Sequence, residues 1–405
     1  AETFTRIRDW IPKVREIVVF GGAPPPGMLD GDSLVAAASE AELPPSISEF
    51  TTVMYTSGTT GRPKGALRRA QDPLQVKSLL ELIGHVPEDR YITTGPLYHS
   101  GPGGYLSVAH LLANPVVLQR RFDAQDWLRL VDKYRVSMTF SAPTPIRFVC
   151  NLPPDVKAEY DRSSMRRMIA NAAPWSFALK EAYLADFPED SLWEVYGSTE
   201  LGIDTVLAPQ DQRRKPGSCG QPAPMVEIRL YDAEGREVTE ANVPGEVYVR
   251  SAATFSTYYK ADERAAEARR GAFATVGDIA YRDEEGYLYI CDRKTDMVIS
   301  GGMNIYPAEI EAVLERHPAV LEAAVFGLPD EQWGETLYAV IVPRIGRTIV
   351  TDQLITFARQ HLAGYKVPRS ISVAAELPHT GSGKVLKREL REQHWRVGPN
   401  GPKDR

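Results

Sequence analysis

Short runs of β-branched residues alternate with helical stretches in the front half of the chain. The runs at residues 17–20, 51–55, 116–118 and 136–140 predict strands, and residues 126–134 predict a helix between the last two. Strands that alternate with helices are typical of an α/β fold with a largely parallel sheet. We therefore expect such a sheet in this half of the chain.

The pattern changes after about residue 222. Apolar and polar residues alternate over 226–231 and again over 245–250, with a turn at 232–235 and no helix between the two runs. This spacing is typical of hairpins. It predicts a small antiparallel sheet or barrel.

A second change falls near residue 292. A short mixed segment follows, with a predicted helix at 307–317 that begins at Pro307 and is closed by Pro318. We place a domain boundary here. The expected fold class is α/β, with a large N-terminal domain of layered α/β subdomains, a small β-barrel-like subdomain and a small α+β C-terminal domain.

Length and charge narrow the class of protein. The chain has 405 residues, which suggests two or three domains, and 43% of them are hydrophobic. The net charge is −6 without a basic stripe, so no nucleic-acid partner is expected. No apolar run approaches the ~20 residues of a membrane span. Three scattered cysteines without metal-ligand spacing predict reduced thiols and a cytoplasmic protein.

The strongest chemical signal is the segment from Tyr55 to Gly65. Glycines let backbone N–H groups converge on phosphate oxygens, hydroxyls add donors, and a lysine adds positive charge. The Walker A pattern does not fit, because Pro63 and Gly65 flank the lysine where Gly and Ser or Thr belong. The segment is predicted to bind phosphate in another way, through Thr56, Ser57, Gly58, Thr59, Thr60, Gly61 and Lys64.

Further motifs follow in order along the chain. They are residues 171–174, 196–200, 276–278, 292–293, 300–310, 365–368 and 377–387. Together with the loop at 55–65 they resemble the motifs of the adenylate-forming superfamily, which includes acyl-CoA synthetases, luciferases and nonribosomal adenylation domains. The resemblance implies an AMP-forming acid–thiol ligase that uses ATP, Mg²⁺ and coenzyme A.

The resemblance assigns residues to the nucleotide and the metal. In the family a tyrosine packs on adenine, a threonine meets the α-phosphate and a glutamate helps to hold Mg²⁺, and the matching residues are Tyr196, Thr199 and Glu200. Thr56 is the second metal candidate, since hard oxygen ligands suit Mg²⁺. The turn that lines the adenine pocket corresponds to Asn171, where relatives often have Gly, and to Ala172, Ala173 and Pro174.

The ribose, the pantetheine arm and the catalytic lysine also have counterparts. Asp278 and Arg293 match the ribose-binding pair, because a carboxylate accepts from ribose hydroxyls and a guanidinium donates to them. Gly301 and Gly302 match the segment that forms part of the pantetheine tunnel, and Lys384 matches the lysine of adenylation. Taken alone, these residues would indicate turns, a surface ion pair and a solubilising lysine.

The acid pocket is less defined. His99 lies in the segment 97–104, which resembles the pocket-lining loop of the family. It has two open interpretations, a residue that closes the pocket and a histidine packed against backbone. Trp175 stands where relatives often have a smaller residue, which predicts a shortened or reshaped acyl cavity.

The implied reaction has two steps. The acid and ATP give acyl-AMP and pyrophosphate, and the acyl group then passes to the thiol of coenzyme A. Three alternatives stay open: an enzyme of one half-reaction, an enzyme that loads a separate carrier-protein thiol, and a silent nucleotide-binding protein. The last is disfavoured because the candidate residues are intact: Lys64, Glu200, Asp278, Arg293 and Lys384.

The family also implies a mobile C-terminal domain. We expect a large domain at 1–292, β-rich over about 222–292, a hinge at 293–296 and a small domain at 297–405. Thr295 stands where relatives usually carry Asp or Lys. Only 54 residues precede Tyr55, so the usual N-terminal segment is expected to be lacking, and a homodimer could cover the sheet edge that this leaves open.

Overall fold

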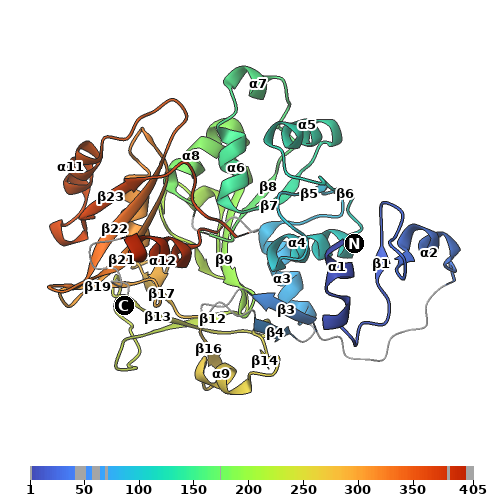
Figure 1. Ribbon diagram of the computed structural model, residues 1–405, viewed down its shortest axis with the longest axis horizontal. Coiled ribbons are helices and arrows are strands. Elements are labelled where there is room, and N and C mark those ends of the chain that lie inside the picture. The colour runs from blue at the N-terminus through green and yellow to red at the C-terminus, as the bar shows by residue number, and fades with distance from the viewer. Residues whose placement is uncertain are drawn as a thin grey trace. The chain divides into compact units, whose positions relative to one another are not determined.

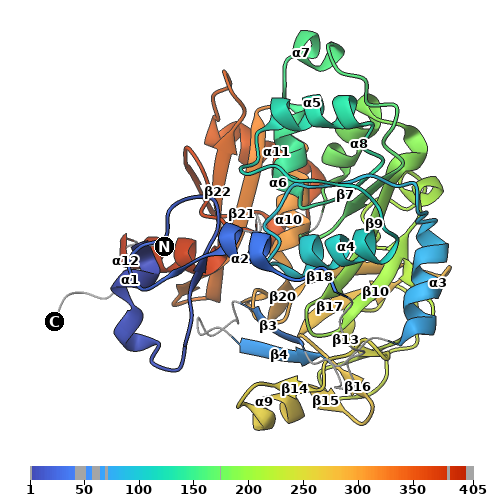
Figure 2. The ribbon, with the colours of Figure 1, turned by 90° about the vertical axis from the view of Figure 1, so that its right-hand side faces the viewer.

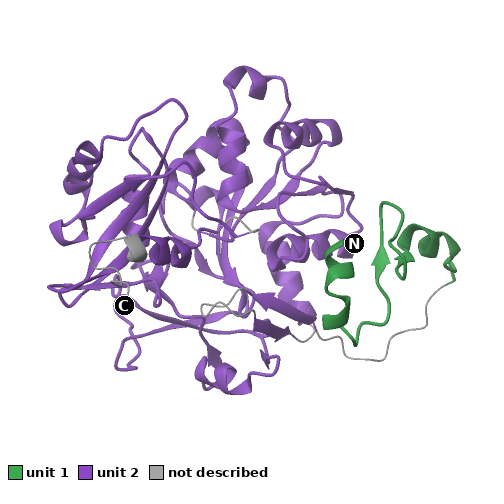
Figure 3. Ribbon diagram, viewed as in Figure 1, with its two compact units in different colours: residues 1–49 green, residues 50–405 purple. Residues whose placement is uncertain are grey.

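The computed structural model describes residues 2–41, 52–56, 64–68, 72–173, 175–380 and 384–397. The chain divides into two compact units, residues 1–49 and residues 50–405 (Figure 3). In the first unit β1 and β2 pair in parallel. Its elements are α1 (Glu2–Arg6), η1 (Arg8–Trp10), β1 (Val18–Val19), β2 (Leu29–Asp30) and α2 (Gly31–Ala37).

The main sheet of the second unit has the predicted parallel character. In the described part of the chain its strands run in the order β11-β10-β9-β8-β7-β5-β6 (Figure 1). The pairs from β6 to β9 are parallel, and β10 and β11 add an antiparallel edge. The strands are β5 (Tyr91–Thr93), β6 (Val116–Val117), β7 (Met138–Ser141), β8 (Arg167–Ala170), β9 (Leu192–Ser198), β10 (Gly202–Leu207) and β11 (Gln221–Pro222).

Helices cover both faces of this sheet. Successive strand residues point to opposite faces, and in β8 Met168 and Ala170 enter one core whereas Ile169 enters the other. The first core packs against α5, α6 and α8, and the second against α3 and α4. The helices are α3 (Pro73–Ile83), α4 (Ser100–Leu111), α5 (Ala124–Tyr134), α6 (Pro143–Cys150), α7 (Pro154–Ala158) and α8 (Phe177–Asp186), with η2 (Glu189–Ser191) and η3 (Pro209–Asp211).

Two predicted strands lie outside the parallel sheet: the run at 17–20 forms β1 of the first unit, and the run at 51–55 forms β3. β3 (Thr52–Thr56) pairs antiparallel with β4 (Lys64–Arg68), which pairs in turn with β14 (Thr257–Tyr258). A short connection permits a hairpin, whereas a parallel pair needs a long crossover. The predicted phosphate loop at 57–63 lies outside the described residues, but its two ends meet, because Thr56 is opposite Lys64.

The alternating runs after residue 222 form the predicted antiparallel pair. In β12 and β13, Ile228 lies opposite Val249 and Leu230 opposite Val247, and all four side chains enter one core. β16 and β17 also pair with β13. The elements are β12 (Glu227–Tyr231), β13 (Gly245–Arg250), α9 (Asp262–Glu267), β15 (Arg269–Arg270), β16 (Phe273–Ala274), β17 (Asp278–Arg282) and β18 (Leu288–Arg293).

Residues from 298 onward build another sheet, drawn in orange and red in Figures 1 and 2. In β21, Ala323 and Val325 face the core of α10 and α11, and Ala324 and Phe326 face that of α12. The elements are β19 (Val298–Ser300), β20 (Met303–Ile305), α10 (Pro307–Leu314), β21 (Val320–Asp330), β22 (Gly334–Pro343), α11 (Thr351–His361), η4 (Gly364–Lys366), β23 (Ser370–Val373) and α12 (Lys387–Val397).

Helix α10 begins at Pro307 as predicted but ends three residues early. The N–H groups of Arg316 and His317 donate to the carbonyls of Val313 and Leu314, three residues back, so the predicted last turn is a tighter one.

Within the described ranges, no helix has the length and apolar character that a membrane crossing requires.

Candidate active site

Two distant segments, one at Thr56 and one at 255–258, meet Glu200. Its Oε1 accepts hydrogen bonds from the Tyr258 hydroxyl at 3.1 Å and from the Thr56 hydroxyl at 3.4 Å. Its backbone carbonyl accepts from the Phe255 N–H at 2.6 Å. The carboxylate therefore lies at the mouth of the β3–β4 hairpin, and the two predicted metal-binding residues, Thr56 and Glu200, are in contact.

Lys64 adds a positive charge beside this carboxylate. Its Nζ lies 5.3 Å from the centre of the Tyr258 ring. Burial lowers the pKa of Lys64, and Arg264 lowers it further, whereas Glu200 opposes the change. The ends of the predicted loop thus present hydroxyl, carboxylate and ammonium groups together, as a phosphate and its cation require. Ser57, Gly58, Thr59, Thr60 and Gly61 lie outside the described residues.

Thr199 and His99 each have a hydrogen-bond partner in the first residues of α4. The Thr199 hydroxyl is 2.9 Å from the Ser100 hydroxyl, and His99 caps α4 by accepting from the Gly101 N–H at 3.3 Å through Nδ1. Burial lowers the pKa of His99, which favours the neutral ring that such an acceptor needs. Of the two interpretations of His99, its bond to backbone is present in the structure. A role of His99 in closing an acid pocket stays a prediction.

The two residues predicted to bind ribose contact each other, and one of them is bonded to Tyr196, which is predicted to pack on adenine. The Tyr196 hydroxyl donates to Asp278 Oδ2 at 2.7 Å, and Arg293 Nε lies 3.3 Å from Asp278 Oδ1. Asp278 and Arg293 are opposite each other in the β17–β18 ladder. Burial, together with the charge of Asp278, raises the pKa of Tyr196 well above its ordinary value, so the phenol stays a donor.

The predicted catalytic lysine lies within the electrostatic reach of this pair. The Lys384 carbonyl accepts from the Thr380 N–H at 2.8 Å, which closes a small hairpin before α12. Burial lowers the pKa of Lys384 to about 8, Arg293 adds to the effect, and Asp296 and Asp278 oppose it. Lys384 is therefore electrostatically coupled to Asp278 of β17 and Arg293 of β18, the two residues predicted to bind ribose.

The predicted adenine turn carries an unusual backbone. Ala172 has φ of 70°, in the left-handed region that costs a non-glycine residue ~1–2 kcal/mol. The Asn171 side chain holds it, since its amide donates to the Val195 carbonyl of β9 and its oxygen accepts from the Ala172 N–H. Ala173 follows in the same turn, and Pro174 lies outside the described residues. Strain of this kind gathers at binding sites.

The two predicted pantetheine glycines lie apart from the nucleotide residues. Gly301 and Gly302 form the β19–β20 turn with φ of 57° and 79°. The Gly301 N–H donates to the Trp333 carbonyl at 2.8 Å, and a Cβ at Gly301 would meet the Trp333 ring at 2.8 Å. Among the described residues, no hydrogen bond or ion pair joins this turn to Tyr196, Asp278 or Arg293.

The sequence interpretation missed Asp204 and Tyr258. Asp204 sits at the irregularity of the β9–β10 ladder, directly before Thr205, which is the residue opposite Tyr196. It is fully buried, and neither carboxyl oxygen has a hydrogen-bond partner among the described residues. Burial and the charge of Asp278 raise its pKa well above the ordinary value, against the effect of Arg68. Tyr258 is 58 residues from Glu200, so no local pattern could indicate their contact.

Trp175 has a different place from the one expected. It is 3% exposed and belongs to the core beneath α8, where its ring lies edge-on to Tyr183 with centroids 6.4 Å apart. The chain enters α8 at once and the indole lies in the core, and the prediction of a shortened or reshaped acyl cavity stays a prediction.

Two further features lie outside this site. Burial raises the pKa of Cys150, Cys219 and Cys291 to about 12 each, so these free thiols are protonated and unsuited as nucleophiles.

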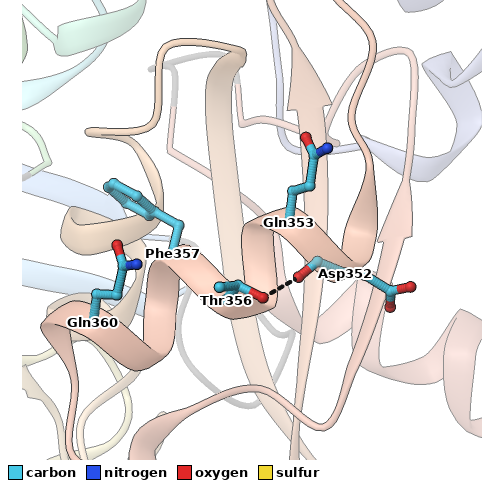
Figure 4. Close-up of a pocket in the computed structure, with 5 residues that line it drawn as sticks. All are labelled: Asp352, Gln353, Thr356, Phe357 and Gln360. Atoms are coloured by element: carbon cyan, nitrogen blue, oxygen red, sulfur yellow. Dashed lines mark hydrogen bonds between the residues drawn. The ribbon is translucent and has the colours of Figure 1, made fainter.

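A recess of about 300 Å³ lies on α11 (Figure 4). In the described part of the chain its lining residues all belong to that helix: Asp352, Gln353, Thr356, Phe357 and Gln360.

Two family models and several known proteins are similar to this chain. The model of the AMP-binding enzyme family matches residues 5–259, and that of the AMP-binding enzyme C-terminal domain matches residues 309–384. The chain is 36% identical over 374 residues to a feruloyl-CoA synthase from Amycolatopsis sp, covering 91% of this chain and 74% of that protein. It is 34% identical over 378 residues to an indoleacetate–CoA ligase from Aromatoleum aromaticum, covering 91% and 73%.

A solved structure agrees with this similarity. An anthranilate CoA ligase, AuaEII, in complex with anthranoyl-AMP superposes with a TM-score of 0.86 and 27% identity, covering 96% of this chain and 76% of that one.

Proposed function

Since the chain belongs to the family of AMP-binding enzymes, we propose that this site joins a carboxylic acid to AMP with ATP and then passes the acyl group to the thiol of coenzyme A. One observation supports the proposal most directly. Asp278 contacts both Arg293 and the Tyr196 hydroxyl, and the charges of Asp278 and Arg293 act on the pKa of Lys384. Tyr196 is also close in sequence to Glu200, which contacts Thr56.

The nucleoside part of ATP would bind on β9, β17 and β18. The Asp278 carboxylate accepts from the ribose hydroxyls while Arg293 holds it, and Tyr196 offers its ring to adenine. The turn at Ala172 borders the same strand through the Asn171 side chain. The triphosphate then points toward Thr56, Lys64 and the loop between them.

Glu200 and Thr56 fit the Mg²⁺ that ATP brings. Both offer oxygen, the ligand that Mg²⁺ prefers, and they are 3.4 Å apart. No group of three or more His, Cys, Asp or Glu in the described ranges is arranged to hold a metal. That suits an ion that takes most of its ligands from phosphate and water. When bound, it would neutralise phosphate charge.

In the first step a carboxylate oxygen of the acid forms a bond to the α-phosphorus, and the bond from that phosphorus to pyrophosphate breaks. Two anions approach each other, so stabilisation of the developing charge is the main requirement. The Lys384 ammonium supplies it when protonated, and Lys64 supplies it at the other end of the phosphates. Thr199, held by Ser100, lies beside Glu200 to contact the α-phosphate.

In the second step the sulfur of coenzyme A attacks the acyl carbonyl carbon and AMP leaves with the bonding electrons. The thiol proton passes to solvent, since thiols with a pKa of ~8.5 ionise partly near neutral pH. Residues 293–296 are proposed as the hinge that exchanges Lys384 for the Gly301–Gly302 turn between steps. A carrier protein, a homodimer and a cytoplasmic location stay predictions.

A panel of acids tests the proposal. Ferulate and indole-3-acetate lead it because the two relatives are named for them, and fatty acids of several lengths follow. Each acid is incubated with ATP, Mg²⁺ and coenzyme A, and AMP and acyl-CoA are measured separately. Equal amounts of both support the proposal, AMP alone indicates a half-reaction enzyme, and absence of both with every acid contradicts it.

A further inference from the structure

Arg147 of α6 is held between two carboxylates of the C-terminal region. Its guanidinium lies 3.6 Å from Glu315, directly after α10, and 3.6 Å from Glu322 in β21. All three side chains are only 15% exposed. An ion pair that is largely shielded from solvent is screened less by salt than a surface pair, and breaking it leaves uncompensated charge.

The contact continues to the lysine hairpin. Glu322 Oε1 also lies 2.9 Å from His379 Nε2. His379 opens the hairpin that ends at Lys384: it forms a β-bridge with Val385, and the Lys384 N–H donates to the Thr380 hydroxyl at 3.1 Å. A chain of direct contacts therefore leads from α6 of the main sheet to the backbone of the candidate catalytic lysine.

The surroundings of Arg147 combine polar and apolar side chains around a small void. A cavity of about 40 Å³ lies beside the cluster, and its lining includes the polar residues Arg147, Ser176, Glu315 and Arg344 and the apolar residues Leu179 and Leu321. A void of this size fits a water molecule and removes some apolar contact between the two sides. The two ion pairs of Arg147 are the charged contacts that join Glu315 and Glu322 to α6 beside this void.

We propose that Arg147 is a positioning residue that clamps the C-terminal region in the arrangement where Lys384 reaches the nucleotide. This inference rests on the proposed function and assigns the clamp to its first step. Releasing the clamp lowers the fraction of molecules competent for adenylation, whereas the second step does not require Lys384 at the nucleotide. The two half-reactions should therefore respond differently to the loss of Arg147.

The test compares R147A with a matched variant, R213A. Arg213 also bridges two glutamates, Glu181 and Glu189, but within the main-sheet region. Pyrophosphate exchange should fall ~10-fold in R147A, a typical size for coupling between two sites, and stay within about twofold of wild type in R213A. Thioester formation from supplied acyl-adenylate should stay within about twofold of wild type, or rise, in both variants.

A charge exchange separates the clamp from general damage. R147E places three carboxylates together and should reduce pyrophosphate exchange below R147A. Adding E315R restores a cation between two carboxylates at the C-terminal end of α10, where a positive charge is favourable, and should bring exchange back to within about threefold of wild type. Equal loss of both half-reactions in R147A, an unchanged exchange rate, or a double variant that folds but is not rescued would overturn the proposal.

Amide hydrogen exchange tests whether Arg147 holds the Lys384 hairpin in place, independently of catalytic activity. In R147A, but not in R213A, the amides of Thr380 and Lys384 should exchange several-fold faster than in wild type. If the acid panel contradicts the proposed function, this measurement still decides the clamp, and unchanged protection of both amides in R147A rejects it.

Discussion

At the scale of single residues, burial sets the charge of two groups next to the nucleotide site. Lys384 and Asp204 are both shifted toward their neutral forms. For Lys384 the neutral form is the inactive one in the proposed first step. For Asp204 it is the form that the folded protein prefers. Each shift has a measurable consequence.

Adenylation should fall as the pH rises through about 8. The pKa of Lys384 is lowered to about 8, so the ammonium that the proposed step needs is lost above this pH. The pH profile of kcat/KM for pyrophosphate exchange reports the pKa of the essential groups in the free enzyme.

K384A should lower exchange by at least ~100-fold and leave thioester formation from supplied adenylate within about threefold of wild type. K384R, if active, should lose the fall near pH 8, and an unchanged fall in that variant would assign it to another group.

Replacing Asp204 with Asn should stabilise the protein more at pH 8 than at pH 5. The folded-state pKa of Asp204 is raised, so the folded protein binds more protons than the unfolded chain, and stability falls as the pH rises from the unfolded pKa of ~3.9 toward the folded value. The neutral amide has no proton to lose and avoids this loss, which is ~1.4 kcal/mol for each pH unit over that range. Urea unfolding of D204N and wild type at both pH values measures it. Equal destabilisation of D204N at both pH values would contradict the shift.

At the scale of elements, the close approach of β9 and β10 positions Glu200. The turn between them places Thr199 and Glu200 directly after β9, and the β3–β4 hairpin meets Glu200 from the other side. Both the ladder and the hairpin are therefore needed before the acidic residue can face Thr56.

Adding a methyl group at Gly197 should damage this element. A Cβ there would lie 1.9 Å from the Gly202 carbonyl oxygen of β10, a distance that only a backbone shift can relieve. G197A should lose ~3 kcal/mol of unfolding free energy. G104A is the control, because a Cβ at this position in α4 meets nothing within 4 Å and should leave stability unchanged or gain up to ~1 kcal/mol. Similar unfolding curves for G197A and wild type would show that the strands separate freely.

At the scale of the whole molecule, the site draws on both the antiparallel sheet and the C-terminal hairpin. Asp278 and Arg293 belong to β17 and β18, whereas Lys384 follows the sheet that begins at residue 298. Binding of ATP and catalysis of its reaction should therefore depend on different parts of the chain.

Thermal shifts with ATP and Mg²⁺ measure this division. At a hundredfold excess of ATP over its Kd, wild type should gain ~2.7 kcal/mol of stability. D278A should lose most of this gain, since the ribose loses its acceptor, and K384A should keep most of it. Melting without ATP shows whether each variant is folded. A gain that is lost equally in D278A and K384A would mean that the lysine, too, is needed to bind the nucleotide.

Local patterns were enough for some of the strands, among them β7, β12 and β13, for the helices α5 and α10, and for several groups of the candidate site. Period-two alternation over 226–231 and 245–250 predicted β12 and β13, because a strand's burial pattern is written directly in its residues. The hydroxyl-rich segment before Lys64 and the acidic motif at Glu200 predicted groups that the structure brings together. Such motifs can be recognised in the sequence because their functional groups belong to neighbouring residues.

Contacts between distant segments required the folded chain. Tyr258 beside Glu200, Asp204 beneath Tyr196, and Arg147 between Glu315 and Glu322 have no sequence spacing that indicates them. The pairing of β3 with β4, and the turn of the Trp175 ring into the core, also came from packing rather than pattern. Local spacing determines which chemical groups a segment carries. Which of them meet, and with what charge, depends on burial and strand order, which are properties of the assembled fold.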